Sequence, residues 1–450
     1  MERIPLMRNS LPHRLAKRML PGALYGVLQR LFDLYRVRGG HSHPTQYSQP
    51  TQFGEAISSA SDAYLSGARI QDLERYFVDA AAAQDADASS SGLSNFSLRI
   101  MGPHWGRNIG HLSLIDVVAK LKALGLLSPE DRFLCFAKTA NDHYFGYVSQ
   151  LFPSLSLEHE QMSALNFSLD CLQDSTSFLR LSNGITSLYP AISLAHRNWN
   201  DRPPLLSLSS DDLEWGASEL ARLNSSHSDW FVTFHVRDGD RRVGRSAPNA
   251  EVCSYLPAMR EVVNRGGVAV RIGDRRMPKL PTVKGIVDYA HATDPSPRLN
   301  TYLMAACRFF VGTASGPLTV PHSFGVPTLY TNAPAVGLVP EFPNTLTLLK
   351  KYVDVRNGRL LHAEEVAERP IAWTVNPSAD PFARGVCNTS AELRDGVVEM
   401  LEHTESADRR VVLRTVEQSA VYSHFRQLLG EHSGVHLSET FLATNKAWLL

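Results

Sequence analysis

Polar and charged side chains follow three short apolar runs in the second half of this chain, at the points where each run stops. They are His235, Arg237 and Asp238 after the first run, Arg271, Gly273 and Asp274 after the second, and Thr313, Ser315 and Gly316 after the third. An apolar run that stops at polar residues and glycine is typical of a buried parallel strand that delivers a site at its carboxyl end. Two arginines at such ends could converge on one diphosphate, because a guanidinium offers several donors to a phosphate.

The third of these segments could add a different kind of anion ligand. Pro317 is a natural first helical residue, so the free N–H groups and the dipole of a helix start would face the Thr313 and Ser315 hydroxyls. Asp288 and His291 end a further run and could reach the ribose or base of a nucleotide. Plainer interpretations stay open, namely an ion pair at a strand edge and a tight turn that needs glycine for its geometry.

A second group of candidates lies in the first half, where a glycine-containing loop leads into a helix. They are Asn108, Gly110 and His111 at the helix start, Asp116 one turn later, Asp142 at the next strand-to-helix turn, and more weakly His104 and His143. A helix N-terminus disfavours the cationic form of histidine, so His111 is expected to stay neutral, as a general base or hydrogen-bonding group must. Asp116 and Asp142 are reserve base candidates. The alternative for His111 is a capping or packing role.

Strands and helices that could position these residues alternate from residue 96 onward. The predicted strands are 96–101, 132–137, 230–236, 268–272, 285–289, 308–311 and 326–330, and the main predicted helices are 56–84, 114–125, 141–151, 210–223, 254–265, 299–306, 317–324 and 390–430. Such alternation favours an α/β fold with a doubly wound parallel sheet. An apolar tail at 441–450 is expected to dock on the body of the protein.

Composition describes an ordinary globular protein. Apolar residues make up 43% and charged residues 20% of 450 residues, enough for two or three domains. Lys+Arg and Asp+Glu both total 45, which argues against a general nucleic-acid-binding protein. Five scattered cysteines without a CxxC suggest neither a disulfide framework nor a cysteine zinc site, and fit a reducing cytoplasm.

Several cofactor and membrane signals are missing or weak. We find no His/Asp/Glu cluster with metal-ligand spacing, no GxSxG and no GxGxxG, so we expect neither a catalytic metal nor a nicotinamide cofactor. No apolar run approaches the roughly 20 residues that span a bilayer. Residues 13–38 are basic and amphipathic, and could rest on an anionic membrane surface or pack on the protein. We therefore expect a cytoplasmic protein with an optional peripheral contact at the inner face of the membrane.

At these residues the chain resembles a family of bacterial surface-carbohydrate glycosyltransferases. The resemblance covers about residues 95–350 and rests on His235-Val-Arg-Asp238, Tyr255-Leu-Pro-Ala258, Val270-Arg-Ile-Gly-Asp274, Val287-Asp-Tyr-Ala-His291, Phe310-Val-Gly-Thr-Ala-Ser-Gly316 and Phe324-Gly-Val-Pro327. More distantly, the chain is similar to fucosyltransferases of the GT-B fold, in which a His-x-Arg motif and a later serine-containing segment hold the donor diphosphate. Those enzymes usually have a second arginine where this chain has Asp238, a departure that leaves the donor sugar open.

The resemblance implies two Rossmann-like lobes that face each other across a cleft. The expected divisions are a helical N-terminal extension with a linker at 1–90, an acceptor lobe at 91–204, a nucleotide-sugar lobe at 205–390 and C-terminal helices at 391–450 that pack back on the body. Asp201-Arg-Pro-Pro204 supplies the boundary between the lobes, because prolines favour an extended connection.

The expected activity is transfer of a hexosyl or deoxyhexosyl unit from a nucleotide sugar to a hydroxyl of a glycan, a lipid-linked molecule or a small molecule. The implied catalytic residues are His111, Asp116 and Arg237, and the implied acceptor residues are Asn108, Gly110, His111 and Asp142. The implied donor-binding residues are His235, Arg237, Asp238, Arg271, Gly273, Asp274, Asp288, His291, Thr313, Ser315 and Gly316. A nucleotide-sugar epimerase on the same fold, or a non-catalytic module that binds a glycan or a partner, are the alternatives.

Overall fold

The computed structural model divides the chain into two units, and the division falls between Pro50 and Thr51. It describes residues 59–60, 62–90, 98–100, 108–127, 132–135, 140–151, 154–156, 178–199, 202–223, 228–238, 249–405 and 415–449. All of these belong to the second unit, Thr51–Leu450. The amphipathic segment 13–38 and His104 lie outside the described residues, so the predictions about them stay predictions.

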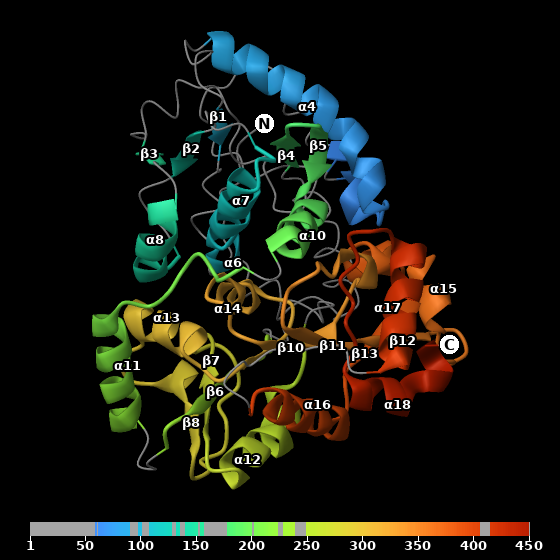
Figure 1. Ribbon diagram of the computed structural model, residues 1–450. Coiled ribbons are helices and arrows are strands. Elements are labelled where there is room, and N and C mark those ends of the chain that lie inside the picture. Colours follow the sequence, from blue (N-terminus) through green and yellow to red (C-terminus); the bar gives the residue numbers. More distant parts are fainter. Residues whose placement is uncertain are drawn as a thin grey trace, which may run out of the picture. The chain divides into compact units, whose positions relative to one another are not determined.

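A six-stranded parallel sheet forms the centre of the described structure (Figure 1). Its order is β11 (Thr345–Leu349), β10 (Thr328–Ala333), β9 (Phe310–Gly312), β6 (Phe231–His235), β7 (Val268–Ile272) and β8 (Ile286–Asp288). Every residue of the five strands other than β8 is buried, as expected for parallel strands covered on both faces. The predicted α/β fold with a parallel central sheet is confirmed.

The register of this sheet decides which side chains share a face. Phe234 pairs with Arg271, and Arg271 pairs with Asp288, so these three residues lie side by side on one face. His235 pairs with Ile272 and with Gly312, one position further along, and therefore lies on the opposite face. The histidine and the second arginine thus reach the carboxyl edge of the sheet from different sides.

Two layers of helices cover the six-stranded sheet. One layer is α11 (Ser210–Leu223) and α13 (Pro297–Ala305), and the other is α12 (Leu256–Asn264) and α16 (Ser390–His403). In the first layer, Thr233 of β6 donates to the Leu303 carbonyl, and Phe231 stacks on Tyr302 with ring centroids 5.7 Å apart. Gly216 of α11 lets the helix lie against Tyr302, because a Cβ there would be 2.2 Å from the ring.

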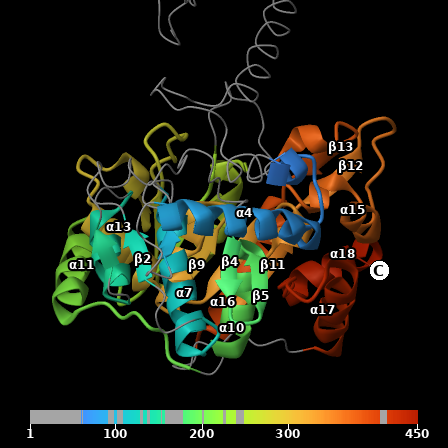
Figure 2. The same ribbon diagram turned by 90° about the horizontal axis from the view of Figure 1, so that it is seen from above.

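A smaller parallel sheet comes from the first half of the chain. Its order is β1 (Leu98–Ile100), β2 (Arg132–Cys135) and β3 (Ser154–Ser156), and its helices are α6 (Ile109–Leu112), α7 (Leu114–Ala123) and α8 (Asp142–Val148). A hairpin of β4 (Phe178–Leu181) and β5 (Gly184–Ser187) follows and leads into α10 (Leu188–Trp199). The helix α4 (Ile70–Ser90) contacts β5, and Figure 2 shows it lying across this part of the structure.

The C-terminal part adds a two-stranded antiparallel sheet and more helices. These elements are β12 (Lys351–Asp354), β13 (Ala383–Val386), α15 (Ala363–Ala367), α17 (Val416–Leu429) and α18 (Glu439–Leu449). Phe441, Leu442, Trp448 and Leu449 of the last helix are buried, and the Trp448 indole donates to the Leu361 carbonyl. The expected docking of the apolar tail is therefore confirmed.

The predicted elements differ from the structure mainly where tertiary packing decides. The helix predicted at 56–84 breaks at Gly67, whose φ is +85° and whose Cβ would meet Pro370 at 2.5 Å. The following helix α4 runs on to Ser90, six residues beyond the predicted end at 84. The helix predicted after Pro317 is two short pieces, η7 (Gly316–Leu318) and α14 (Val320–Ser323). The hairpin β4–β5 and the antiparallel pair β12–β13 were not among the predicted strands.

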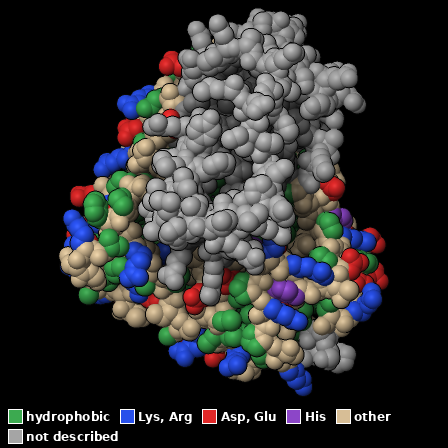
Figure 3. Space-filling model, turned by 180° about the vertical axis from the view of Figure 1, so that it is seen from behind, with side chains coloured by type: hydrophobic (Ala, Val, Ile, Leu, Met, Phe, Trp, Pro, Cys, Tyr) green, Lys and Arg blue, Asp and Glu red, His purple; other side chains and the backbone are tan. Residues whose placement is uncertain are grey.

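Among the described residues, no helix has the length and apolar character needed to cross a membrane. On the part of the surface coloured in Figure 3, Lys and Arg side chains alternate with Asp and Glu.

Candidate functional site

The two groups of candidate residues meet at a contact between two glycines. A Cβ on Gly110 would lie 2.5 Å from the Cα of Gly316, and a Cβ on Gly316 would lie 2.5 Å from Oδ1 of Asn108. Only glycine allows so close an approach, because real Cβ contacts are longer. The start of α6 therefore packs directly against the turn that follows β9.

Hydrogen bonds around this contact hold both turns. The Asn108 side chain accepts from the Gly110 N–H at 2.9 Å and so caps α6. Ser113 Oγ lies 2.6 Å from Thr319 Oγ1, and Thr319 also donates toward the Gly110 carbonyl at 3.2 Å. His111, on the same short helix, is partly exposed. The structure thus brings the predicted acceptor residues beside the predicted glycine-containing donor turn.

His235 is the centre of the hydrogen bonds on the donor side. Its Nδ1 lies 2.9 Å from Ser315 Oγ, and its carbonyl accepts from the Thr313 N–H at 3.1 Å. Thr313 Oγ1 accepts from the Arg237 N–H at 2.9 Å, which ties the end of β6 to the turn after β9. Burial, with the nearby charges of Arg271 and Arg237, lowers the pKa of His235 to about 4. The imidazole is therefore neutral near pH 7 and can orient the Ser315 hydroxyl.

Arg271 is fully buried and uses only part of its hydrogen-bonding capacity. Its Nη1 donates to Oδ1 of Asp288 at 2.8 Å, and Oδ2 of Asp288 accepts from the Leu280 N–H and lies 3.1 Å from Nδ1 of His291. Within the described structure, Nε and Nη2 of Arg271 have no hydrogen-bond partner. Buried donors without partners cost free energy, and more so on a charged group. Arg271 thus keeps two buried donors that an anionic group could use.

The other donor-side candidates have local partners. Arg237 is exposed, whereas Asp238 accepts from the Val252 N–H at 3.1 Å and so anchors the next helical turn. Asp274 pairs with exposed Arg276 at 2.6 Å, and hydrogen bonds from Arg276 lower the pKa of Asp274 to about 2. Arg237 therefore presents an exposed side chain at the end of β6.

Asp116 lies inside the protein rather than on a cleft surface. It is 1% exposed and forms an ion pair of 2.6 Å with Lys120, one turn along α7. Burial raises the pKa of Asp116 to about 6, although Lys120 lowers it. His196 and His322 are close to this pair and also buried, and neither nitrogen of His322 has a partner in the part of the chain described. Asp142, in contrast, is exposed at the start of α8.

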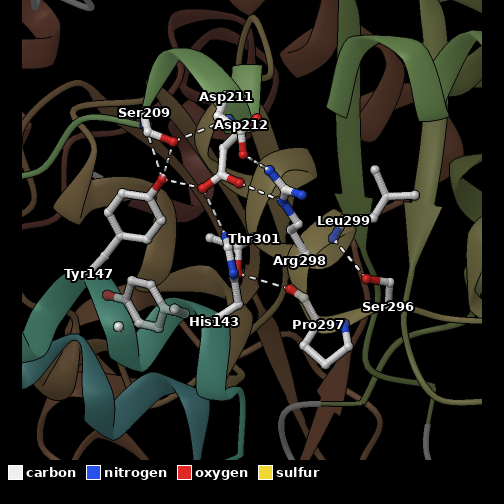
Figure 4. A network of polar contacts seen from close by, with 12 residues as sticks. His143, Tyr147, Ser209, Asp211, Asp212, Ser296, Pro297, Arg298, Leu299 and Thr301 are labelled. Atoms are coloured by element: carbon white, nitrogen blue, oxygen red, sulfur yellow. Dashed lines mark hydrogen bonds and ion pairs between the residues drawn. The ribbon is translucent and has the colours of Figure 1, made fainter. Parts of the chain in front are cut away.

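A second polar cluster joins α8 to α11 and α13 (Figure 4), and of its members only His143 is a candidate from the sequence. Oδ2 of Asp212 lies 2.9 Å from Nε2 of His143 and also accepts from the Tyr147 hydroxyl, while Oδ1 accepts from Arg298 Nε at 2.6 Å. Burial raises the pKa of Asp212, but hydrogen bonds from Tyr147, Arg298 and His143 outweigh it and hold the pKa at about 2. Acidic residues are common in the first turn of a helix, so the positions of Asp211 and Asp212 alone do not indicate a functional site.

A metal centre finds no support among the residues that the structure describes, where no group of three or more His, Cys, Asp or Glu side chains could hold an ion.

Comparisons with known proteins give little further guidance. No protein-family model matches the chain, and no curated protein matches it. Among solved structures, the chain is similar to the ADP-heptose LPS heptosyltransferase II of E. coli, at 14% sequence identity and a TM-score of 0.31. The match covers 56% of this chain and 89% of that one. A superposition of this quality supports no conclusion about activity.

Proposed function

We propose that this chain is a metal-independent glycosyltransferase of the GT-B type, which moves a sugar from a nucleotide-sugar donor to a hydroxyl acceptor in the synthesis of a surface polysaccharide or glycoconjugate. The observation behind the proposal is Arg271, a fully buried arginine at the carboxyl edge of a parallel sheet with two donor nitrogens that no described group uses. A diphosphate would supply the acceptors that these donors lack. The carboxyl edge is also where open α/β sheets bind their ligands.

In this proposal the six-stranded sheet belongs to the donor lobe and the three-stranded sheet to the acceptor lobe. Arg237, Arg271 and the Thr313–Gly316 turn neutralise the diphosphate as it leaves, a form of electrostatic stabilisation that needs no metal ion. Neutral His235 orients the Ser315 hydroxyl toward the ligand. His291 lies near the position expected for the ribose or base, beside the Arg271–Asp288 pair.

The acceptor would bind on the other side of the glycine contact. Asn108, Gly110 and His111 lie there at the start of α6, and Asp142 is exposed at the start of α8. His111 is partly exposed and within reach of a ligand, whereas Asp116 is enclosed with Lys120. We therefore assign His111 to acceptor binding and Asp116 to the support of α7.

A thermal-shift experiment tests the donor site. UDP, GDP, CDP, ADP and dTDP are each added with Mg²⁺ or with EDTA to the wild-type protein, Arg237→Ala and Arg276→Ala. Arg276 is a matched control, because it is an exposed arginine that pairs with Asp274. One nucleotide should raise Tm equally with Mg²⁺ and EDTA, by the equivalent of about 2.7 kcal/mol at 100 times Kd.

The increase should persist in Arg276→Ala and disappear in Arg237→Ala. If no nucleotide raises the Tm of the wild-type protein, the glycosyltransferase proposal is wrong. If the increase requires Mg²⁺, metal independence is wrong.

A further inference from the structure

His143 and Asp212 form a pair with the geometry of a general acid–base site. Nε2 of His143 lies 2.9 Å from the Asp212 carboxylate, and the imidazole meets the Tyr147 ring edge-on with centroids 5.7 Å apart. The ionised carboxylate accepts a hydrogen bond from Nε2–H, so the lone pair of the neutral ring is on Nδ1. No described residue bonds to Nδ1, and the His143 side chain is 29% exposed. A reacting group can therefore reach this nitrogen.

The surroundings of Asp212 keep this pair in one protonation pattern. Its side chain is 7% exposed, and it receives hydrogen bonds from His143, Tyr147 and Arg298. Arg298 is itself fixed, because it pairs with Asp211 and lies 4.3 Å from the centre of the Trp215 ring. With a pKa of about 2, Asp212 stays ionised near neutral pH. A surface ion pair would have neither this burial nor three convergent donors.

The pair also lies where both sheets present the ends of their strands. Helix α8 follows β2, α13 follows β8, and α11 precedes β6, so all three helices begin on the carboxyl side of a parallel sheet. Helix α8 contacts α6, which carries His111, on one side and α13 on the other. Asn141, the cap of α8, donates to the Pro297 carbonyl at 3.1 Å and so fixes His143 relative to α13.

We infer that His143, oriented by Asp212, is the general base for the hydroxyl acceptor. This inference rests on the proposed glycosyl transfer. The acceptor O–H bond breaks and its proton goes to Nδ1 of His143, while the acceptor oxygen forms a bond to the anomeric carbon of the donor sugar. The bond between that carbon and the diphosphate oxygen breaks, and its electron pair leaves with the nucleoside diphosphate. The imidazolium then releases the proton to water.

Kinetics of four proteins test the assignment: the wild type, His143→Gln, His111→Gln and His424→Gln. His424 on α17 is a matched control, because it also pairs with a carboxylate, Glu364 at 3.4 Å, and is 36% exposed. The thermal-shift test identifies the nucleoside diphosphate. The kinetic assay then measures release of that nucleoside diphosphate from its nucleotide sugar in the presence of an acceptor mixture. His143→Gln should lower kcat by about 10²- to 10⁴-fold, with no change in the nucleotide-induced Tm increase. His111→Gln should mainly raise the acceptor KM, and His424→Gln should change neither.

The pH dependence of the rate separates catalysis from support. In a plot of kcat against pH, the decrease of kcat that a titrating base causes on the acid side should be lost in His143→Gln and kept in His111→Gln. A His143→Gln protein with a lower Tm but near-wild-type kcat would show that the cluster only joins helices, and would overturn the inference.

Chemical modification gives a readout that needs no substrate. Diethyl pyrocarbonate acylates accessible, nucleophilic imidazole nitrogens, and peptide mass spectrometry locates the sites. His143 should react faster than His424, and Asp212→Asn should slow its reaction. If no nucleotide binds but His143 shows this reactivity, the acid–base pair stands and the proposed sugar transfer fails. If His143 reacts no faster than His424, the pair is not a base.

Discussion

The contact between Gly110 and Gly316 makes a sharp prediction about one methyl group. In Gly110→Ala, the new Cβ would lie 2.5 Å from the Cα of Gly316 and 3.1 Å from its carbonyl oxygen. Carbon atoms pack at about 3.5–4.0 Å, so the two backbones must separate by roughly 1 Å. The neighbouring atoms belong to the backbone and cannot rotate away, unlike the end of a flexible side chain.

The size of the effect follows from two opposing terms. Overpacking in a well-packed region typically costs about 1–3 kcal/mol. Replacing glycine by alanine in a helix returns at most about 1 kcal/mol, and less here because α6 has only four residues. We therefore expect Gly110→Ala to be less stable than the wild type by about 1–2 kcal/mol. For a chain of 450 residues this lowers Tm by about 1–2 °C, because the unfolding entropy is roughly 2.1 cal/mol/K per residue.

Gly146→Ala is the matched control, because Gly146 lies inside the neighbouring helix α8 and a Cβ there would meet nothing within 4 Å. That variant should be as stable as the wild type or slightly more so. Differential scanning calorimetry measures both variants under the same conditions. If Gly110→Ala unfolds at the same temperature as Gly146→Ala, the close approach of α6 to the turn after β9 does not exist in solution.

Three further predictions concern the buried ionisable groups. The folded-state pKa values of His235 and His322, about 4 and about 3, lie below the ordinary value of 6.5. The stability associated with their neutral forms is therefore complete above pH 6.5 and is lost as the pH falls below it, on the order of 3 kcal/mol for His235 by pH 4. His322→Phe, which keeps the stack on Phe342 at 4.0 Å, should flatten this acid loss in urea titrations between pH 7 and 4, and an unchanged slope would contradict it. The pKa of Asp116 shifts in the opposite direction, from 3.8 to about 6. Protonation of Asp116 therefore stabilises the folded protein as the pH falls through 6, and Asp116→Asn should steepen the loss of stability in acid. Arg271→Lys keeps the charge but not the unused Nε and Nη2 donors, and should abolish the nucleotide-induced Tm increase; full retention would remove Arg271 from the donor site.

The strands and their polar ends could be predicted from the sequence because each depends on local pattern. The run before His235 is apolar and stops at charged residues, and β6 ends there. Gly110 and Gly316 are both predicted site residues, but their contact with each other could not be predicted. Nothing in a single sequence states which turn packs against which, since that depends on the relative placement of two sheets.

The burial of Asp116 shows a different limit. Its spacing from Lys120 is the ordinary i,i+4 pair of a solvated helix face. The neighbouring residues carried the missing information: Leu114 to Leu121 are all buried, so α7 is enclosed on every side. Burial of the whole helix makes Asp116–Lys120 an enclosed ion pair, which the spacing of these two residues alone does not show.

Burial also separates the two arginines that the sequence made look equivalent. Both lie near the end of an apolar strand, yet Arg237 is exposed and Arg271 is fully buried against Asp288. Loss of Arg237 removes a charge from the surface and should alter ligand binding alone. Loss of the Arg271 charge would leave the partly buried Asp288 carboxylate without its ion-pair partner, so both binding and folding would suffer. The two arginines therefore need different substitutions before their effects on nucleotide binding can be compared.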